Sequence, residues 1–274
     1  MQYLCLATTI KDDEYYIKEW LTFYDIVGVE RFYIVLHNTT DNTLQRINEL
    51  PFRNRITIHE VQTSDSWNHQ IGIYNWLLSC YKKNTKWMLF VDGDEFLFGT
   101  EKNDLKTLLE PYEAYPGVLV PRLDFGPSGF DVRPEMPSVK HYRMRMPEKN
   151  IVYSSDIVKT IVQPDLTHYA ISSHLFWSEQ EVVNERFEKY LIPHGYKKFH
   201  IDDYNPSFDT FRVNHYYTRS FEDWQQRLKR GANTPWVQKN RYNNNSYQLV
   251  QYLATVEDLT IQRFVPELEC RLSE

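Results

Sequence analysis

The chain has 274 residues, of which 42% are hydrophobic and 25% are charged, and this composition is typical of a globular protein. It excludes a disordered, collagen-like or coiled-coil chain. The formal net charge of -6 argues against a protein that binds nucleic acid mainly through phosphate contacts. Aromatic residues make up 15% of the chain, which suits a packed core as well as a surface that binds sugars or bases.

The cysteines and the apolar segments bear on the compartment. Cys5, Cys80 and Cys270 are far apart and form no C-x-x-C or Cys/His cluster, so we expect neither a disulfide framework nor a structural zinc site. No basic residue precedes Lys11, which argues against a secretory signal peptide. No apolar run approaches the roughly 18 to 20 residues that span a bilayer. These features predict a cytoplasmic protein.

Strand and helix patterns alternate through the first hundred residues. We expect strands at 3–7, 31–36, 55–61 and 87–91, and helices at 14–27, 42–50, 68–81 and 104–115. Further on, we expect strands at 118–121, 157–162 and 211–216, helices at 221–228 and 246–256, and a polar, mobile loop at 195–209. The alternation predicts right-handed βαβ units in a single α/β domain with a mainly parallel sheet.

Polar segments follow the predicted strands. They are Thr8–Asp13, His37–Asp41, Thr63–Ser66 and Asp92–Glu95. Because ligands bind at the carboxyl ends of strands in such sheets, we expect these segments to form one rim around a binding site.

The sequence Asp92-Gly93-Asp94 directly follows the apolar strand at 87–91. Two carboxylates with no thiolate nearby suit Mg²⁺ or Mn²⁺ and leave coordination positions for phosphate and water. The alternative is a structural turn in which the aspartates bind backbone amides. The buried strand and the α/β context favour the metal site.

Four segments resemble the motifs of GT-A glycosyltransferases of families 2 and 92, in the same order. Met88–Phe96 resembles their DXD motif in its D-x-D-E-F form. The other three segments are Lys11–Glu14 with Glu19-Trp20-Leu21 (the K-N-E…E-W opening), Phe125–Gly129 (the F-G-S-S-G loop), and Asn214–Ser220 with Glu222, Trp224, Arg227, Arg230 and Gly231 (the H-Y-x-T-K-S…R-G close).

The resemblance implies a GT-A-like fold and metal-dependent transfer of a hexose from a nucleotide diphosphate sugar, with UDP as the expected nucleotide and with inversion at the sugar carbon. Asp92, Asp94 or both would hold Mn²⁺ or Mg²⁺, with His215 as a third ligand, and the metal would neutralise the diphosphate leaving group. Residues 1–100 would form the nucleotide-sugar half, 101–235 the acceptor half and 236–274 a helical tail. The acceptor would be a glycan or a lipid-linked glycan.

The same resemblance assigns further site residues. Those expected to line the base and ribose pocket are Thr8, Lys11, Asp13, Asn38 and Asp41. Lys159 and Arg219 would hold phosphate oxygens, and Arg219 stands where the family pattern has Lys. His174 would face the sugar or the acceptor. For Lys11 and Asp13 the alternative is a solvated loop, and for His174 it is a structural role.

No residue stands out as the catalytic base. An inverting transfer needs a carboxylate near the acceptor hydroxyl, and Asp124 and Glu179 are the two candidates by their order in the chain. Pro127 and Phe130 depart from the family loop, which puts acceptor specificity in question. The rings expected in or beside the site are those of Tyr216, Tyr217, Phe125, Phe130 and Trp177.

Two other functions remain open. A haloacid-dehalogenase-like phosphatase also has D-x-D after a strand, with Asp92 as nucleophile, but there the motif usually opens the chain. A non-catalytic glycan-binding protein would be expected to show short alternating strands. The basic stretch from Arg219 to Arg230 could contact an acidic membrane surface. The alternative is that it forms an ordinary solvated helix. The oligomeric state is left open.

Overall fold

The structure is a computed structural model that describes residues 1–273 except 64–68, 149–156, 197–200, 202 and 232–242. Three predicted features fall partly outside the described residues. They are the rim segment Thr63–Ser66, the loop at 195–209 and the first residue of the helix expected at 68–81.

The first hundred residues follow the predicted order of strands and helices. The elements are β1 (Gln2–Ile10), α1 (Ile17–Ile26), β2 (Arg31–His37), α2 (Thr43–Asn48), β3 (Ile56–Val61), α3 (Gln70–Tyr81), β4 (Thr85–Phe90) and β5 (Glu95–Gly99). The later elements are α4 (Leu105–Leu109), β6 (Gly117–Asp124), β7 (Met144–Arg145), β8 (Val158–Val162), β9 (Tyr169–Ala170), β10 (Phe176–Trp177), β11 (Val182–Val183), β12 (Lys189–Tyr190), β13 (Phe211–His215), α5 (Phe221–Arg230), α7 (Asn244–Leu253), β14 (Val256–Glu257) and α8 (Val265–Leu272).

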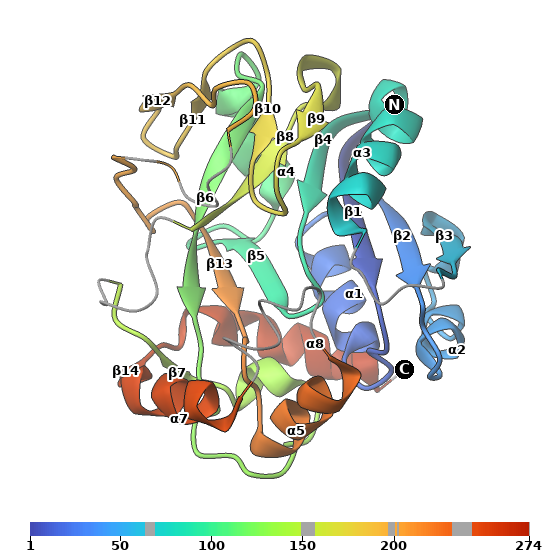
Figure 1. Ribbon diagram of the computed structural model, residues 1–274, viewed down its shortest axis with the longest axis vertical. Helices are drawn as coiled ribbons and strands as arrows, with labels where there is room; N and C mark the ends of the chain where they lie inside the picture. Colours follow the sequence, from blue (N-terminus) through green and yellow to red (C-terminus); the bar gives the residue numbers. More distant parts are fainter. Residues whose placement is uncertain (64–68, 149–156, 197–200, 202, 232–242, 274) are drawn as a thin grey trace.

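The main sheet has the strand order β12-β11-β6-β8-β4-β1-β2-β3 (Figure 1). β4, β1, β2 and β3 are parallel to one another, and β8 runs antiparallel between β4 and β6. β13 continues the sheet by pairing parallel with β6 and antiparallel with β5. The predicted α/β class with a mainly parallel sheet is therefore confirmed, and the carboxyl ends of β1, β2 and β4 lie at the same edge.

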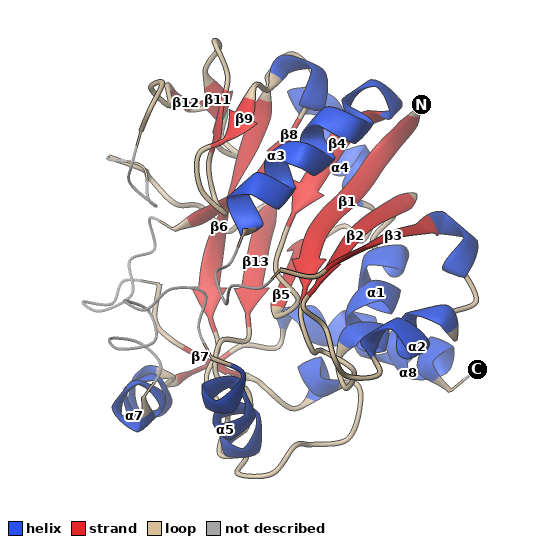
Figure 2. Cartoon of the chain, turned by 45° about the vertical axis from the view of Figure 1, so that its right-hand side comes forward, coloured by secondary structure: helices blue, strands red, loops and turns tan. Residues whose placement is uncertain are grey.

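Helices cover both faces of this sheet, with α3 on one side and α1 and α8 on the other (Figure 2). Side chains alternate along β1: Leu4 and Leu6 belong to the core cluster that contains α1 and α8, whereas Cys5 and Ala7 belong to the cluster under α3. Strands with both faces buried read as continuous apolar runs, which is why the sequence identified them.

The sequence-based prediction did not include β5, α8 or the two-residue strands β7, β9, β10, β11, β12 and β14. β5 begins immediately after the Asp92–Asp94 turn and pairs with β13, which is more than a hundred residues further along the chain. α8 packs against α1, with Val265 and Leu268 buried. None of the helices in the described part of the chain has the uninterrupted apolar length that a bilayer-spanning helix needs.

Candidate active site

The acidic turn after β4 is closed by its own backbone and by Glu95. The Glu95 amide donates to the Asp92 carbonyl at 3.0 Å, and the Asp92 amide donates to Glu95 Oε2 at 2.9 Å. Trp20 Nε1 and Tyr24 Oη each donate to the Glu95 carbonyl at 2.9 Å. The turn is therefore held rigidly against α1, and Glu95 is fully buried.

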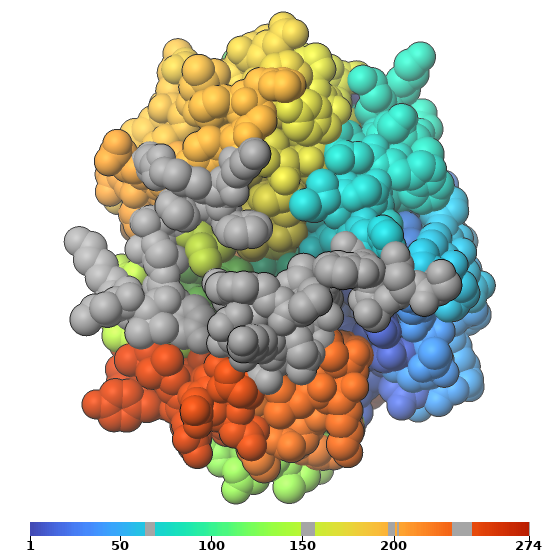
Figure 3. Space-filling view, viewed as in Figure 1, coloured from blue at the N-terminus to red at the C-terminus, as the bar shows by residue number. Residues whose placement is uncertain are grey.

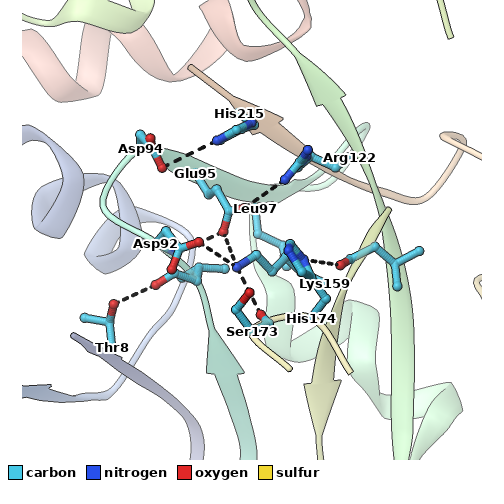
Figure 4. Close-up of polar contacts among 12 residues, drawn as sticks. Thr8, Asp92, Asp94, Glu95, Leu97, Arg122, Lys159, Ser173, His174 and His215 are labelled. Carbon is cyan, nitrogen blue, oxygen red and sulfur yellow. Dashed lines mark hydrogen bonds and ion pairs between the residues drawn. The ribbon is translucent and has the colours of Figure 1, made fainter. Parts of the chain in front are cut away.

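The Asp92 carboxylate already has partners on both oxygens, and Figure 4 shows its contact with Lys159. Its Oδ1 accepts from Gln70 Nε2 at 2.5 Å and from Tyr74 Oη at 3.2 Å. Its Oδ2 lies 3.0 Å from Lys159 Nζ, which also lies 2.7 Å from Glu95 Oε2. Asp92 thus belongs to a charge network that the motif alone did not reveal.

Lys159 does not face the rim as a phosphate ligand, which corrects that expectation. Its side chain is only 1% exposed, and its ammonium also donates to the Ser173 carbonyl at 3.2 Å. Burial alone would lower the pKa of Lys159, but the Asp92 and Glu95 carboxylates raise it above its usual value. In this structure Lys159 is a buried cation that balances two carboxylates.

The side chains of Asp94, His215 and Asp124 lie in a row, with the His215 imidazole between the two carboxylates. β13 pairs His215 with Glu95 of β5 on one side and with Asp124 of β6 on the other. His215 Nδ1 lies 2.5 Å from Asp124 Oδ1, and His215 Nε2 lies 3.7 Å from Asp94 Oδ1. Figure 4 shows the imidazole directed at the Asp94 carboxylate.

Both aspartates in this row are held in the ionised form. Burial would raise the pKa of Asp94, but the neighbouring Arg227 guanidinium and His215 lower it well below its usual value. Likewise, burial opposes ionisation of Asp124, while Arg122 and the hydrogen bond from His215 lower its pKa. Arg122 Nε lies 3.2 Å from Asp124 Oδ1.

This geometry fits a divalent cation at two of the three predicted ligands. An ionised Asp124 only accepts hydrogen bonds, so His215 Nδ1 is the donor in this contact and Nε2 is the ring nitrogen directed at Asp94 Oδ1. A carboxylate behind the imidazole is the usual support for a metal-binding histidine. Among the described residues, no group of three His, Cys, Asp or Glu side chains converges on one point. Asp92 therefore does not join Asp94 and His215 in this structure.

The basic end of α5 faces the acidic rim. The helix begins with a capping box between Ser220 and Asp223. Arg227 pairs with Asp94 Oδ2, and Arg230 Nη1 donates to the Lys11 carbonyl at 2.8 Å. Arg227 and Arg230 are therefore bonded to other parts of the same chain. These contacts do not support the expected contact of this stretch with a membrane.

Arg219 and Asp13 meet beside the Gly93 backbone. Arg219 Nη1 lies 3.4 Å from Asp13 Oδ1, its Nη2 donates to the Gly93 carbonyl at 3.0 Å, and its guanidinium carbon lies 3.5 Å from the centre of the Tyr16 ring. Arg219 therefore lies at the rim, where its described partners are the Asp13 carboxylate and the Gly93 carbonyl.

Asp13 lies at the rim with 12% of its side chain exposed, and one of its oxygens has no hydrogen-bond partner. That atom, Oδ2, would lie 2.9 Å from a Cβ atom placed on Gly93, so the glycine makes room for the carboxylate. Burial raises the pKa of Asp13 to about 6, although Arg219 and Arg230 oppose the shift. Asp13 is thus a proton-binding group that points into the rim.

Four other predicted site residues have structural partners. Thr8 is fully buried and its hydroxyl donates to the Val91 carbonyl at 2.7 Å, so it joins β1 to β4 and does not line a pocket. Asn38 Oδ1 accepts from the Thr63 amide at 2.8 Å, and Asp41 Oδ1 accepts from the Thr43 amide at 2.9 Å. Lys11 is exposed, and its carbonyl oxygen accepts the hydrogen bond from Arg230 Nη1.

His174 likewise has the structural role that was its alternative. Its Nδ1 lies 2.9 Å from the Val158 carbonyl oxygen. Burial and the nearby Lys159 and Arg122 hold the pKa of His174 well below its usual value, so the ring is neutral. The turn around His174 nevertheless touches the site through the Ser173 carbonyl.

The two base candidates lie in different surroundings. Asp124 is buried behind His215, where it positions the imidazole and does not face an acceptor. Glu179 has a side chain that is 76% exposed, and it lies 3.5 Å from His168 Nε2. Of the rings expected at the site, those of Phe125 and Tyr216 belong to the buried core, whereas Trp177 is partly exposed.

Several residues of the charge network were missed from the sequence, namely Gln70, Tyr74, Glu95 and Arg122. Only Glu95 carried a signal, since it directly follows the Asp-Gly-Asp motif. The others come from different elements, and nothing in their local sequence distinguishes them from surface or core positions.

Comparison with known proteins agrees with the motif order. The sequence model of glycosyltransferase family 92 matches residues 2–247. A family 92 protein of Ricinus communis is 24% identical over 249 residues, which are 84% of this chain and 38% of that protein. The galactan beta-1,4-galactosyltransferase GALS2 of Arabidopsis thaliana is 26% identical over 106 residues, which are 36% of this chain and 20% of that protein.

Among solved structures, S. aureus TarS 1-349 in complex with UDP aligns with a TM-score of 0.40 at 18% identity, covering 60% of this chain and 48% of that one. The chain spans about two fifths of the length of two family 92 relatives, 38% of the Ricinus communis protein and 40% of a protein of Arabidopsis thaliana. The match to the family model covers nearly all of the chain and confirms the resemblance that the four motifs carried. The chain belongs to glycosyltransferase family 92.

Proposed function

We propose that this chain transfers a hexose from a nucleotide diphosphate sugar, with UDP as the nucleotide, to a hydroxyl group of a glycan and with inversion at the sugar carbon. The observation that carries the proposal is the row Asp94–His215–Asp124 at the carboxyl edge of the sheet. It presents a carboxylate oxygen and the His215 Nε2 atom 3.7 Å apart, with an ionised carboxylate behind the imidazole.

Asp94 Oδ1 and His215 Nε2 are the atoms proposed to hold Mn²⁺ or Mg²⁺, which would neutralise negative charge on the departing diphosphate. Asp124 keeps the His215 imidazole in the tautomer and orientation that this requires. Arg227 and Arg219 add fixed positive charge beside Asp94 and Asp13. Such fixed charges need no reorganisation as the leaving group becomes more negative.

The contacts of Asp92 weigh against the phosphatase alternative. A nucleophilic aspartate needs a free carboxylate oxygen, yet the Asp92 oxygens accept hydrogen bonds from Gln70, Tyr74 and Lys159. Family 92 membership weighs in the same direction. A non-catalytic glycan-binding protein remains the competing function, and only an assay of transfer separates it from the enzyme.

The acceptor proposed for the first assays is β-1,4-linked galactan. Its support is the similarity to relatives named galactan beta-1,4-galactosyltransferases. We assign no base, because Asp124 is enclosed by Arg122 and His215 and Glu179 pairs with His168 beside Trp177.

The experiment is a transfer assay with UDP-galactose and UDP-glucose, β-1,4-galactotetraose and Mn²⁺, run with wild-type protein and the Asp94→Asn variant. Wild-type activity that is lost on chelation and lowered at least 100-fold in the variant supports the proposal. The control is Asp165→Asn, at an exposed acid outside the site, which should behave as wild type. Binding of tetrasaccharide without binding of any UDP-sugar would favour the non-catalytic alternative.

A further inference from the structure

A short hairpin beside the site carries aromatic rings on its outer face. β9 and β10 pair antiparallel, with Tyr169 opposite Trp177 and Ala170 opposite Phe176. Paired residues share a face of a hairpin, and successive residues alternate between its faces. Ala170 and Phe176 are buried in the core under α3, so Tyr169 and Trp177 lie on the other face.

Two histidines complete a set that we call the ring cluster, consisting of His168, Tyr169, Trp177 and His194. The Trp177 ring centre lies 4.4 Å from that of His168, 5.3 Å from that of Tyr169 and 5.0 Å from that of His194. The two histidines are exposed, and Tyr169 and Trp177 are partly exposed. Four neighbouring rings at the surface are more than the scattered exposed aromatic residues of an ordinary protein surface.

The chemistry of the ring cluster suits an uncharged sugar chain. A pyranose ring presents C–H groups that pack on an aromatic face, and it carries hydroxyl groups that need hydrogen-bond partners. His168 Nε2 lies 3.5 Å from Glu179 Oε1, so an imidazole and a carboxylate border the rings. Both side chains are largely exposed, at 47% and 76%, and can bond to hydroxyl groups.

The hairpin connects the ring cluster directly to the candidate active site. Its turn contains Ser173, whose carbonyl accepts from Lys159, and His174, whose carbonyl accepts from Thr160 Oγ1 at 2.6 Å. Trp177 follows Ser173 by four residues, which at about 3.3 Å a residue places it at most about 13 Å further along the hairpin. The segment that contains β9 and β10, yellow in Figure 3, forms part of the surface of this face.

We infer that the ring cluster is a binding subsite for the sugar chain of the acceptor, with Trp177 as the surface on which a sugar ring stacks. The subsite lies on the hairpin whose turn contacts Lys159 and Thr160, where the further sugar residues of an acceptor chain would extend from the hydroxyl that receives the hexose. The role of the ring cluster as an acceptor subsite rests on the proposed transferase function. Binding of a sugar chain at the rings can be measured without transfer.

The test combines binding and kinetics on the full chain. Binding of β-1,4-galactotetraose and of cellotetraose is measured by calorimetry without nucleotide, for wild type, Trp177→Ala and Trp177→Phe. The matched control is Trp76→Ala, because Trp76 is also a surface tryptophan, 43% exposed, but lies on α3 beside His59. In the transfer assay, KM for the tetrasaccharide and for the UDP-sugar are determined separately.

We expect Trp177→Ala to weaken binding of at least one tetrasaccharide tenfold or more and to raise its KM similarly, while KM for the UDP-sugar stays unchanged. Trp177→Phe should retain most of the binding, and Trp76→Ala should behave as wild type. Equal binding by Trp177→Ala and wild type, an equal loss in Trp76→Ala, or no binding of either sugar by wild type would overturn the inference. Trp177-dependent binding without transfer would instead overturn the proposed function and leave the subsite standing.

Discussion

His215 Nδ1 lies 2.5 Å from Asp124 Oδ1, although 91 residues separate the two side chains in the sequence. The parallel register of β13 against β6 places them opposite each other. Since Asp124 is ionised and buried, it fixes the imidazole so that Nε2 faces Asp94. The contact gives Asp124 a positioning role that differs from that of a catalytic base.

The Asp124→Asn variant separates these two roles. The amide oxygen can still accept from His215 Nδ1 but lacks the negative charge, so we expect Mn²⁺-dependent UDP binding to weaken about 10- to 100-fold. Calorimetry of UDP with and without Mn²⁺ measures this, and thermal unfolding checks that the fold persists. A fall in kcat with unchanged UDP binding would show instead that Asp124 acts as the base.

Substitution of Gly93 by Ala should disturb the site through Asp13. The added Cβ would lie 2.9 Å from Asp13 Oδ2 and 3.1 Å from Ile10 Cδ1, so the carboxylate must move. We expect a destabilisation of about 1–3 kcal/mol and weaker UDP-sugar binding, measured by urea unfolding and calorimetry.

Gly72→Ala is the matched control for Gly93→Ala. Its Cβ would meet no atom within 4 Å, and it lies inside α3, where Ala is favoured over Gly by roughly 0.5–1 kcal/mol. The control should therefore be as stable as wild type or more so. If both variants bind UDP-sugar like wild type, close contact at Gly93 does not matter for binding.

Lys159→Met tests the buried charge network. The variant leaves Asp92 and the fully buried Glu95 without their shared cation, and breaking a buried pair in this way costs about 3–5 kcal/mol. Urea unfolding measures the loss. Lys140→Met, which removes an exposed pair with Glu269, should change stability little. Similar small effects of both variants would contradict the assigned role of Lys159.

Asp13 should make the stability of the protein depend on pH. Its pKa is about 6 in the folded protein against 3.8 for the free side chain, so the folded state binds the proton more tightly. The stability that it contributes is full below pH 3.8 and is lost as the pH rises to about 6, by about 3 kcal/mol in total.

The Asp13→Asn variant lacks this titration. We expect its free energy of unfolding, relative to wild type, to rise between pH 4 and pH 7, as measured by urea unfolding at each pH. A constant difference across this range would show that Asp13 has an ordinary pKa in the folded protein.

The sequence alone determined the fold class, most of the element order and the position of the acidic turn. Continuous apolar runs mark strands buried on both faces, and Asp92-Gly93-Asp94 after such a run marks the edge of the sheet. The family resemblance followed from four ordered motifs and was confirmed. These features depend on neighbours in the chain, and local sequence therefore carries them.

Tertiary structure decided what each charged side chain does. Lys159 and Asp92 meet because β8 pairs with β4, and Asp124 meets His215 because β13 pairs with β6. Whether a carboxylate is ionised or binds a proton depends on burial and on charges from distant segments, as Asp94 and Asp13 show. Neither the burial of a carboxylate nor the charges beside it can be read from local sequence, because both are set only when the strands pair.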